Sequence, residues 1–89
     1  MNPCKIIVVD DDPIIRMDIR EILEDGGYEV VAEGKNGEEA VALAFQHKPD
    51  LLIMDVKMPV MDGIKAAQII NKKYAPAILL LTAYSQKEL

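Results

Sequence analysis

Short apolar runs alternate along the chain with longer segments in which apolar residues recur at helical spacing. Four of the runs are rich in Ile, Val, Leu or Ala and have the length of a strand: residues 4–9, 28–32, 51–54 and 77–83. The second run contains an acidic residue, so we expect it at an edge of its sheet. Strands that alternate with helices predict an α/β fold, with a parallel sheet, helices on both faces and right-handed crossovers.

The first helical segment has clear signals at both ends. Asp12 is a favoured N-cap and Pro13 fits the first helical position. The pair Gly26-Gly27 ends the segment. Between these ends, apolar residues at i, i+4, i+7 and i+8 form one stripe that we expect to face the core: Ile15, Ile19, Ile22 and Leu23.

Two further helices are marked mainly at their starts. Asn36 caps the second, with Glu39 as its capping-box partner three residues later. Asp62 caps the third, whose inward-facing residues we expect to be Ile64, Ala66, Ala67 and Ile70. Residues 85–89 have the pattern of the first turn of another helix.

Polar side chains stand where three of the predicted strands end. Asp10, Asp11 and Asp12 follow the first strand, Asp55 follows the buried run 51–54, and Thr82 lies at the end of the last. The carboxyl edge of an open parallel sheet is where such folds place their chemistry. Three carboxylates close together oppose one another's ionisation unless a cation neutralises them, and oxygen ligands on loops suit Mg²⁺ better than zinc.

An acidic cluster with Mg²⁺ can support chemistry on a phosphoryl group. A carboxylate beside the metal can attack phosphorus and form an aspartyl phosphate. The metal offsets charge on the phosphoryl oxygens, and the Thr82 hydroxyl can donate to one of them. Ala83 is small and leaves room for the group to enter. The simpler alternatives are that Asp12 and Asp62 are helix caps and that the Asp run is a solvated turn.

Composition narrows the function further. The 89 residues suffice for one domain, and 51% hydrophobic with 28% charged residues is typical of a globular protein. A net charge of −5 argues against direct nucleic-acid binding by these residues. The single cysteine, Cys4, allows no internal disulfide and no Cys-rich metal site. We find neither a membrane-spanning run nor a signal peptide, and we expect a cytoplasmic protein without membrane contact.

The motifs at the strand ends resemble those of the receiver (REC) domain of bacterial two-component response regulators. The resemblance covers residues 5–85 and rests on three segments: Val8-Val9-Asp10-Asp11-Asp12-Pro13, Met54-Asp55 with Met58-Pro59 and Gly63, and Leu81-Thr82-Ala83. It implies a flavodoxin-like, doubly wound parallel sheet in the order 2-1-3-4.

The resemblance also implies a role for each site residue. Asp55 would be the phosphoacceptor, and Asp10, Asp11, Asp55 and the backbone carbonyl of Lys57 would hold Mg²⁺. Thr82 would be the switch hydroxyl. Met58 and Ala83 would line the phosphoryl pocket. Lys57 and Tyr84 would tune the lifetime of the phosphoryl group.

The partners implied by the resemblance are a sensor histidine kinase or phosphotransfer protein and an output domain. Residues 54–70 and 82–86 are similar to receivers fused to ANTAR RNA-binding antiterminator domains, so the implied output is transcriptional or antitermination control. We expect the protein to assist its own phosphorylation and dephosphorylation only, and not to be a turnover enzyme.

The chain departs from the family near its C-terminus. The family has a fifth strand that carries a Lys, and residues 1–89 would therefore form a receiver domain that is incomplete there. The strand at 77–83 would then be an apolar edge without a charged residue, through which the chain could associate with itself.

Two other functions remain open from the sequence. One is a phosphorylation-independent binding module, with the acidic pocket retained but silent. The other is a phosphatase of the haloacid dehalogenase type, which also uses an Asp nucleophile and Mg²⁺. That class would want Thr or Val where this chain has Ile14, and a cap domain for which the chain is too short.

Overall fold

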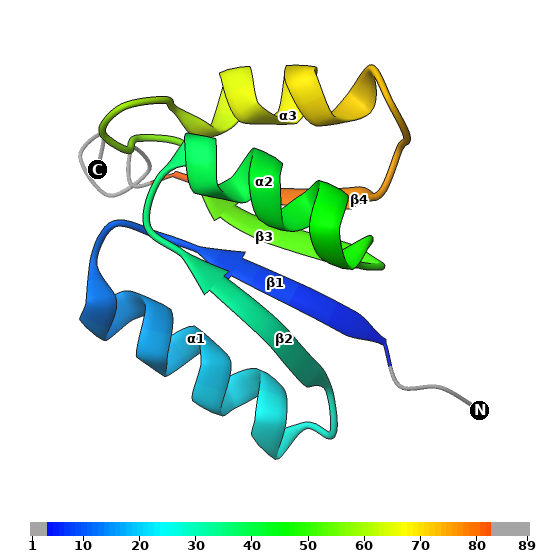
Figure 1. Ribbon diagram of the computed structural model, residues 1–89. Helices are drawn as coiled ribbons and strands as arrows, with labels where there is room; N and C mark the ends of the chain where they lie inside the picture. The colour runs from blue at the N-terminus through cyan, green and yellow to red at the C-terminus, as the bar shows by residue number, and fades with distance from the viewer. Residues whose placement is uncertain (1–3, 83–89) are drawn as a thin grey trace.

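A computed structural model describes residues 4–82 of the chain, which form a four-stranded sheet and three helices (Figure 1). The elements follow one another in strict alternation: β1 (Lys5–Val9), α1 (Pro13–Asp25), β2 (Glu29–Gly34), α2 (Gly37–His47), β3 (Leu51–Asp55), α3 (Gly63–Asn71) and β4 (Ala77–Leu81). The positions predicted for Ala83 and Tyr84, and for a helical turn at 85–89, lie outside the described residues.

All pairings in the sheet are parallel and the strand order is β2-β1-β3-β4. The predicted flavodoxin-like order is therefore confirmed, and so is the edge position of β2. Helix α1 lies on one face of the sheet, and α2 and α3 lie on the other (Figure 1). No helix in the part of the chain from 4 to 82 is long and apolar enough to cross a membrane.

The two faces of the sheet carry cores of different size. The larger core lies under α2 and α3 and consists of Ile7, Val9, Ala40, Ala44, Leu52, Met54, Ala66 and Ile70. The smaller one, on the α1 side, consists of Ile6, Val8, Val30 and Ile53. Alternate residues of β1 and β3 enter opposite cores, which explains why both strands are apolar between Lys5 and Asp10 and between Asp50 and Asp55.

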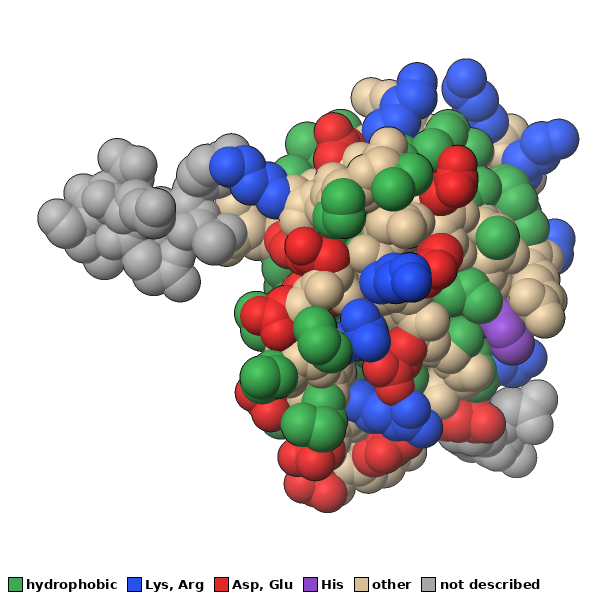
Figure 2. Space-filling view, turned by 60° about the vertical axis from the view of Figure 1, so that its left-hand side comes forward, with side chains coloured by type: hydrophobic (Ala, Val, Ile, Leu, Met, Phe, Trp, Pro, Cys, Tyr) green, Lys and Arg blue, Asp and Glu red, His purple; other side chains and the backbone are tan. Residues whose placement is uncertain are grey.

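The stripe of α1 is only partly buried, which corrects our expectation for two of its residues. Ile19 and Leu23 pack against the smaller core, whereas Ile15 is 44% and Ile22 is 70% exposed. The reason is that α1 is the only described helix on its face and rests mainly on β1 and β2. In Figure 2, hydrophobic side chains lie between acidic ones over the lower part of the molecule, where α1 lies.

The helix starts match their predicted caps. Asp12 accepts hydrogen bonds from the backbone N–H groups of residues 14 and 15, and Asp62 accepts one from residue 65. Asn36 Oδ1 accepts from the Glu39 backbone N–H at 2.8 Å, and the Glu39 carboxylate accepts from the Lys35 backbone N–H at 2.9 Å. The capping box thus exists, but its return bond goes to the residue before the cap.

Three smaller predictions needed correction. Ile64 is 50% exposed because it lies on the outer side of α3, while Ala66 and Ile70 are fully buried. Strand β2 begins at Glu29 rather than Tyr28 and continues to Gly34. Strand β4 ends at Leu81, and it lies at the edge of the sheet that residues 4–82 form, with Leu79 50% exposed.

Candidate metal centre

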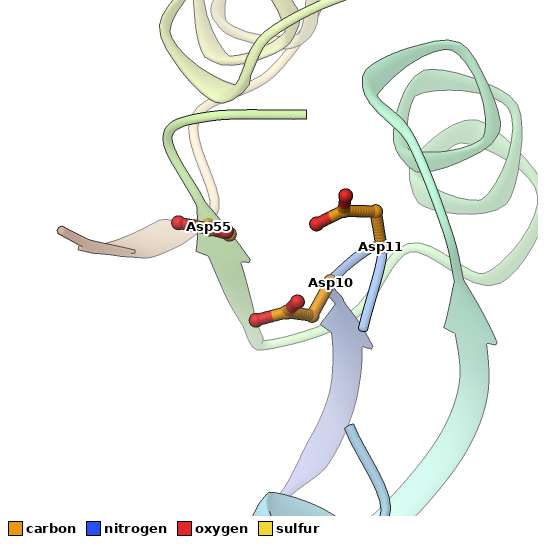
Figure 3. A group of neighbouring side chains, drawn as sticks. All are labelled: Asp10, Asp11 and Asp55. Atoms are coloured by element: carbon orange, nitrogen blue, oxygen red, sulfur yellow. The ribbon is translucent and has the colours of Figure 1, made fainter. Parts of the chain in front are cut away.

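The sheet brings three carboxylates together at the carboxyl edge. Val9 and Met54 are partners in the β1–β3 ladder, so Asp10 and Asp55, the next residue of each strand, lie side by side. Asp11 adds a third group, and ligand oxygens of the three residues lie within 4.8 Å of one another. Figure 3 shows the Asp10 and Asp11 side chains directed toward the end of β3, where Asp55 lies.

Asp10 is the buried member of this cluster, with only 3% of its surface exposed. Its backbone N–H donates to the Gly34 carbonyl oxygen at 3.0 Å, and its Oδ1 accepts from the Asp12 backbone N–H at 2.9 Å. Burial raises the pKa of Asp10, and the negative charges of Asp55 and Asp11 raise it further against the opposing effect of the Asp12 hydrogen bond. A divalent cation would remove this cost of ionisation.

The chemistry of the donor set therefore fits Mg²⁺. Three carboxylates from two strand ends supply hard oxygen ligands on one side and leave the solvent side for waters or a phosphoryl oxygen. Asp55 is partly exposed and Asp11 is exposed, so the site is open to a ligand.

The ladder between β3 and β4 places Thr82 beside this cluster. Asp55 is the partner of Leu81, and the Val56 backbone N–H donates to the Leu81 carbonyl oxygen at 3.0 Å. Thr82 follows directly and is exposed at the same sheet edge as Asp55. Lys57 is exposed just beyond β3, and Met58 is partly buried against the larger core.

The loop from β3 to α3 is held at two points by glycine backbone groups. The Gly63 N–H donates to the Val56 carbonyl oxygen at 2.8 Å, and the Gly37 N–H donates to the Met61 carbonyl oxygen at 2.9 Å. At both glycines an added Cβ would overlap backbone atoms. Between these points Val60 has φ 70°, a left-handed conformation that a β-branched residue rarely adopts.

The sequence analysis missed an ion-paired contact to the cluster. The Arg16 guanidinium donates from Nη1 to the Asp10 carbonyl oxygen at 2.8 Å and from Nε to Glu33 Oε1 at 3.1 Å. Glu33 lies just after the run predicted as the second strand, residues 28–32, and Arg16 lies on α1 beside the apolar stripe. Both charged residues can be seen in the sequence, but only the packing of α1 against β2 shows that they form an ion pair.

A parallel sheet in this order, with an acidic cluster at its carboxyl edge, defines the class of protein. The chain belongs to the family of response regulator receiver domains, which matches residues 6–89. Receivers of this family are signalling modules of two-component systems and typically bind Mg²⁺ at an acidic pocket.

Two relatives are similar to this receiver over nearly its whole length. It is 53% identical over 88 residues to the transcriptional regulatory protein PdtaR of Mycobacterium tuberculosis, covering 98% of this chain and 42% of that protein. It is 44% identical over 86 residues to the chemotaxis protein CheY of Bacillus subtilis, covering 96% of this chain and 72% of CheY. The chain thus spans less than half the length of the transcriptional regulator.

A solved structure supports the fold independently. The response regulator domain of Thermotoga maritima CheB superposes with a TM-score of 0.89 at 33% identity, covering 94% of this chain and 63% of that one. The four described strands and three described helices therefore have the arrangement of a receiver domain.

Proposed function

We propose that this receiver is a phosphorylation-dependent switch in which Asp55 accepts a phosphoryl group with the help of Mg²⁺. The main support is the meeting of three carboxylates at the carboxyl edge, with ligand oxygens within 4.8 Å. Asp10, Asp11, Asp55 and the Lys57 carbonyl would hold the metal, which would supply charge neutralisation for the incoming phosphoryl oxygens. Because Asp55 stands at the end of β3 and is partly exposed, a phosphoryl donor could reach its carboxylate directly.

The chain's own residues divide the remaining work. Asp55 is partly exposed and accessible to a phosphoryl donor, whereas the buried Asp10 serves better as a ligand. The Thr82 hydroxyl would turn toward the phosphoryl group once Asp55 is loaded and so report its presence at the end of β4. Two pairs complete the proposal: Met58 with Ala83 as pocket residues, and Lys57 with Tyr84 as residues that tune phosphoryl lifetime.

The phosphoryl donor in this proposal is a histidine kinase or phosphotransfer protein, and the output is regulatory. The relative PdtaR bears the name of a transcriptional regulatory protein, which supports transcriptional or antitermination control. An RNA-binding output domain, and an incomplete C-terminal part of the receiver in residues 1–89, stay predictions, as does a cytoplasmic location.

Intact mass after incubation with acetyl phosphate and Mg²⁺ tests the proposal. We expect a gain of one phosphoryl group by the 89-residue chain and none by the Asp55→Asn variant. The matched control is Asp62→Asn, which also removes a carboxylate after β3 but alters only the cap of α3. Omission of Mg²⁺ should abolish the gain in the parent chain and in Asp62→Asn.

The result that contradicts the proposal is a folded chain that gains no phosphoryl group, or one that gains it equally in the Asp55→Asn variant. Retained Mg²⁺ binding without an adduct would favour the phosphorylation-independent binding module instead. Continuous release of phosphate from a small phosphate ester would revive the phosphatase alternative, which the receiver family assignment does not support.

A further inference from the structure

Arg16 joins the acidic cluster to the edge strand of the sheet. It lies in the first turns of α1, where its guanidinium bridges the Asp10 carbonyl oxygen, at 2.8 Å from Nη1, and Glu33 Oε1, at 3.1 Å from Nε. The side chain of Arg16 is only 21% exposed, so this fork is largely withdrawn from water. A planar guanidinium can hold two acceptors in a fixed relative position.

The bridge closes a ring around the backbone of Asp10. The Asp10 N–H donates to the carbonyl oxygen of Gly34, the neighbour of Glu33 on β2, at 3.0 Å. The Asp10 carbonyl returns through Arg16 to the Glu33 carboxylate. Both polar backbone groups of Asp10 are therefore tied to two consecutive residues of one strand.

The carbonyl that Arg16 holds belongs to the peptide between the first two acidic residues. Rotation about the Cα–C bond of Asp10 would move that carbonyl oxygen and turn the Cα–Cβ bonds of Asp10 and Asp11 relative to each other. The ligand oxygens of the three carboxylates lie within 4.8 Å of one another, so their mutual repulsion would favour such a rotation when no cation is bound. A donor fixed on this carbonyl opposes it and keeps both side chains directed at Asp55 (Figure 3).

A second arginine provides an internal comparison. Arg20 lies one turn further along α1 and donates from Nη1 to the other oxygen of Glu33 and from Nε to Glu24 at 3.1 Å. Its side chain is 44% exposed, and its bonds go to carboxylates rather than to the backbone of the cluster. Both arginines thus donate to Glu33, but their second acceptors differ: the Asp10 backbone carbonyl for Arg16 and the Glu24 carboxylate for Arg20.

We propose that Arg16 is a positioning residue for the metal site, acting through the peptide between Asp10 and Asp11. The inference rests on the proposed function because it takes these residues as Mg²⁺ ligands. Partners one step behind metal ligands commonly change metal affinity about 10-fold to 100-fold when they are removed. If Arg16 only fastened α1 to β2, its loss would change stability and leave Mg²⁺ affinity unaltered.

The test compares the same substitution at the two arginines. Mg²⁺ is titrated into the 89-residue chain and into Arg16→Lys and Arg20→Lys, with binding followed by amide chemical shifts and folding by thermal unfolding. Lysine keeps the charge but cannot reach two acceptors with a planar fork. We expect the Mg²⁺ Kd to rise about tenfold in Arg16→Lys and by less than about twofold in Arg20→Lys.

A third variant separates this inference from the proposed function. In Asp11→Asn, Mg²⁺ binding should be strongly weakened. A strong loss in Asp11→Asn would establish the metal site. If Arg16→Lys then shows the Mg²⁺ Kd of the parent chain, or the same small rise as Arg20→Lys, the positioning role is wrong while the metal site stands. If the parent chain itself binds no Mg²⁺, the metal site is wrong and the role of Arg16 with it.

Discussion

Replacing Gly63 by alanine should slow phosphorylation of the receiver, although alanine is the better helix former. Gly63 is buried at the start of α3, directly behind the proposed acceptor. A Cβ added there would overlap the Asp55 carbonyl oxygen and would lie 3.1 Å from its carbonyl carbon and 3.2 Å from the Val56 Cα. All three neighbours are backbone atoms, so no change of rotamer can relieve the overlap.

The structure sets the size of the effect. A carbon and a carbonyl oxygen normally approach no closer than about 3.3 Å, so the end of β3 and the start of α3 must separate by about 1 Å. Overpacking of this kind costs about 1–3 kcal/mol, against a gain of up to about 1 kcal/mol from helix propensity. A misplacement of about 1 Å at a reacting group can cost about 100-fold in rate, which is the loss that we expect.

The rate of phosphorylation by acetyl phosphate with saturating Mg²⁺ gives the main measurement, and urea unfolding gives the stability. Gly26→Ala is the matched control, because its added Cβ would have no neighbour closer than 3.5 Å and its φ is −83°. We expect that variant to keep the parent rate. A Gly63→Ala protein with the parent rate and stability would refute the close approach of α3 to Asp55 and the argument built on it.

Three further predictions concern an ion pair, a hydrogen bond and the edge strand. Burial acts to raise the pKa of Glu33, but the hydrogen bonds and charges of Arg20 and Arg16 together outweigh it and lower the pKa, so these contacts stabilise the fold at neutral pH. This contribution to the free energy of unfolding, under about 1 kcal/mol, is lost as the pH falls below about 4. The free energy of unfolding of Glu33→Gln should therefore fall less than that of the parent chain over the same pH range. Tyr74→Phe removes the 3.0 Å hydrogen bond to the Ala44 carbonyl oxygen and should cost about 1 kcal/mol in urea unfolding, where no loss would contradict the bond. Leu79→Lys puts a charge on the exposed edge strand and should weaken self-association of the 89-residue chain in sedimentation velocity, whereas a monomeric parent chain would refute association through β4.

Much of the fold could be predicted because the signals act over a few residues. Asp12 and Asp62 cap the helices that follow them, through bonds to residues two or three positions away. The apolar runs of β1 and β3 predicted strands buried on both faces, and the alternation of strands and helices predicted the parallel sheet. The acidic residues and Thr82 were found in the same way, because each stands at or just beyond the end of an apolar run.

Exposure was predicted less well, because a periodic pattern says which residues share a face but not what covers that face. Ile15 and Ile22 belong to the apolar stripe of α1 but stay exposed where no other described element packs on them. Ile64 has the spacing of an inward residue, yet α3 buries the face with Gly63, Ala66 and Ile70 and leaves Ile64 outside.

The sequence by itself determined which elements form, where the helices begin and which residues stand at the carboxyl edge of the sheet. Only the tertiary structure decided that Arg16 reaches Glu33, 17 positions away, and that Gly63 lies against the backbone of Asp55. The physical reason is the range of the interactions. Caps and periodicity are properties of one segment, whereas these contacts depend on how closely two elements pack, which is set by the whole core beneath them.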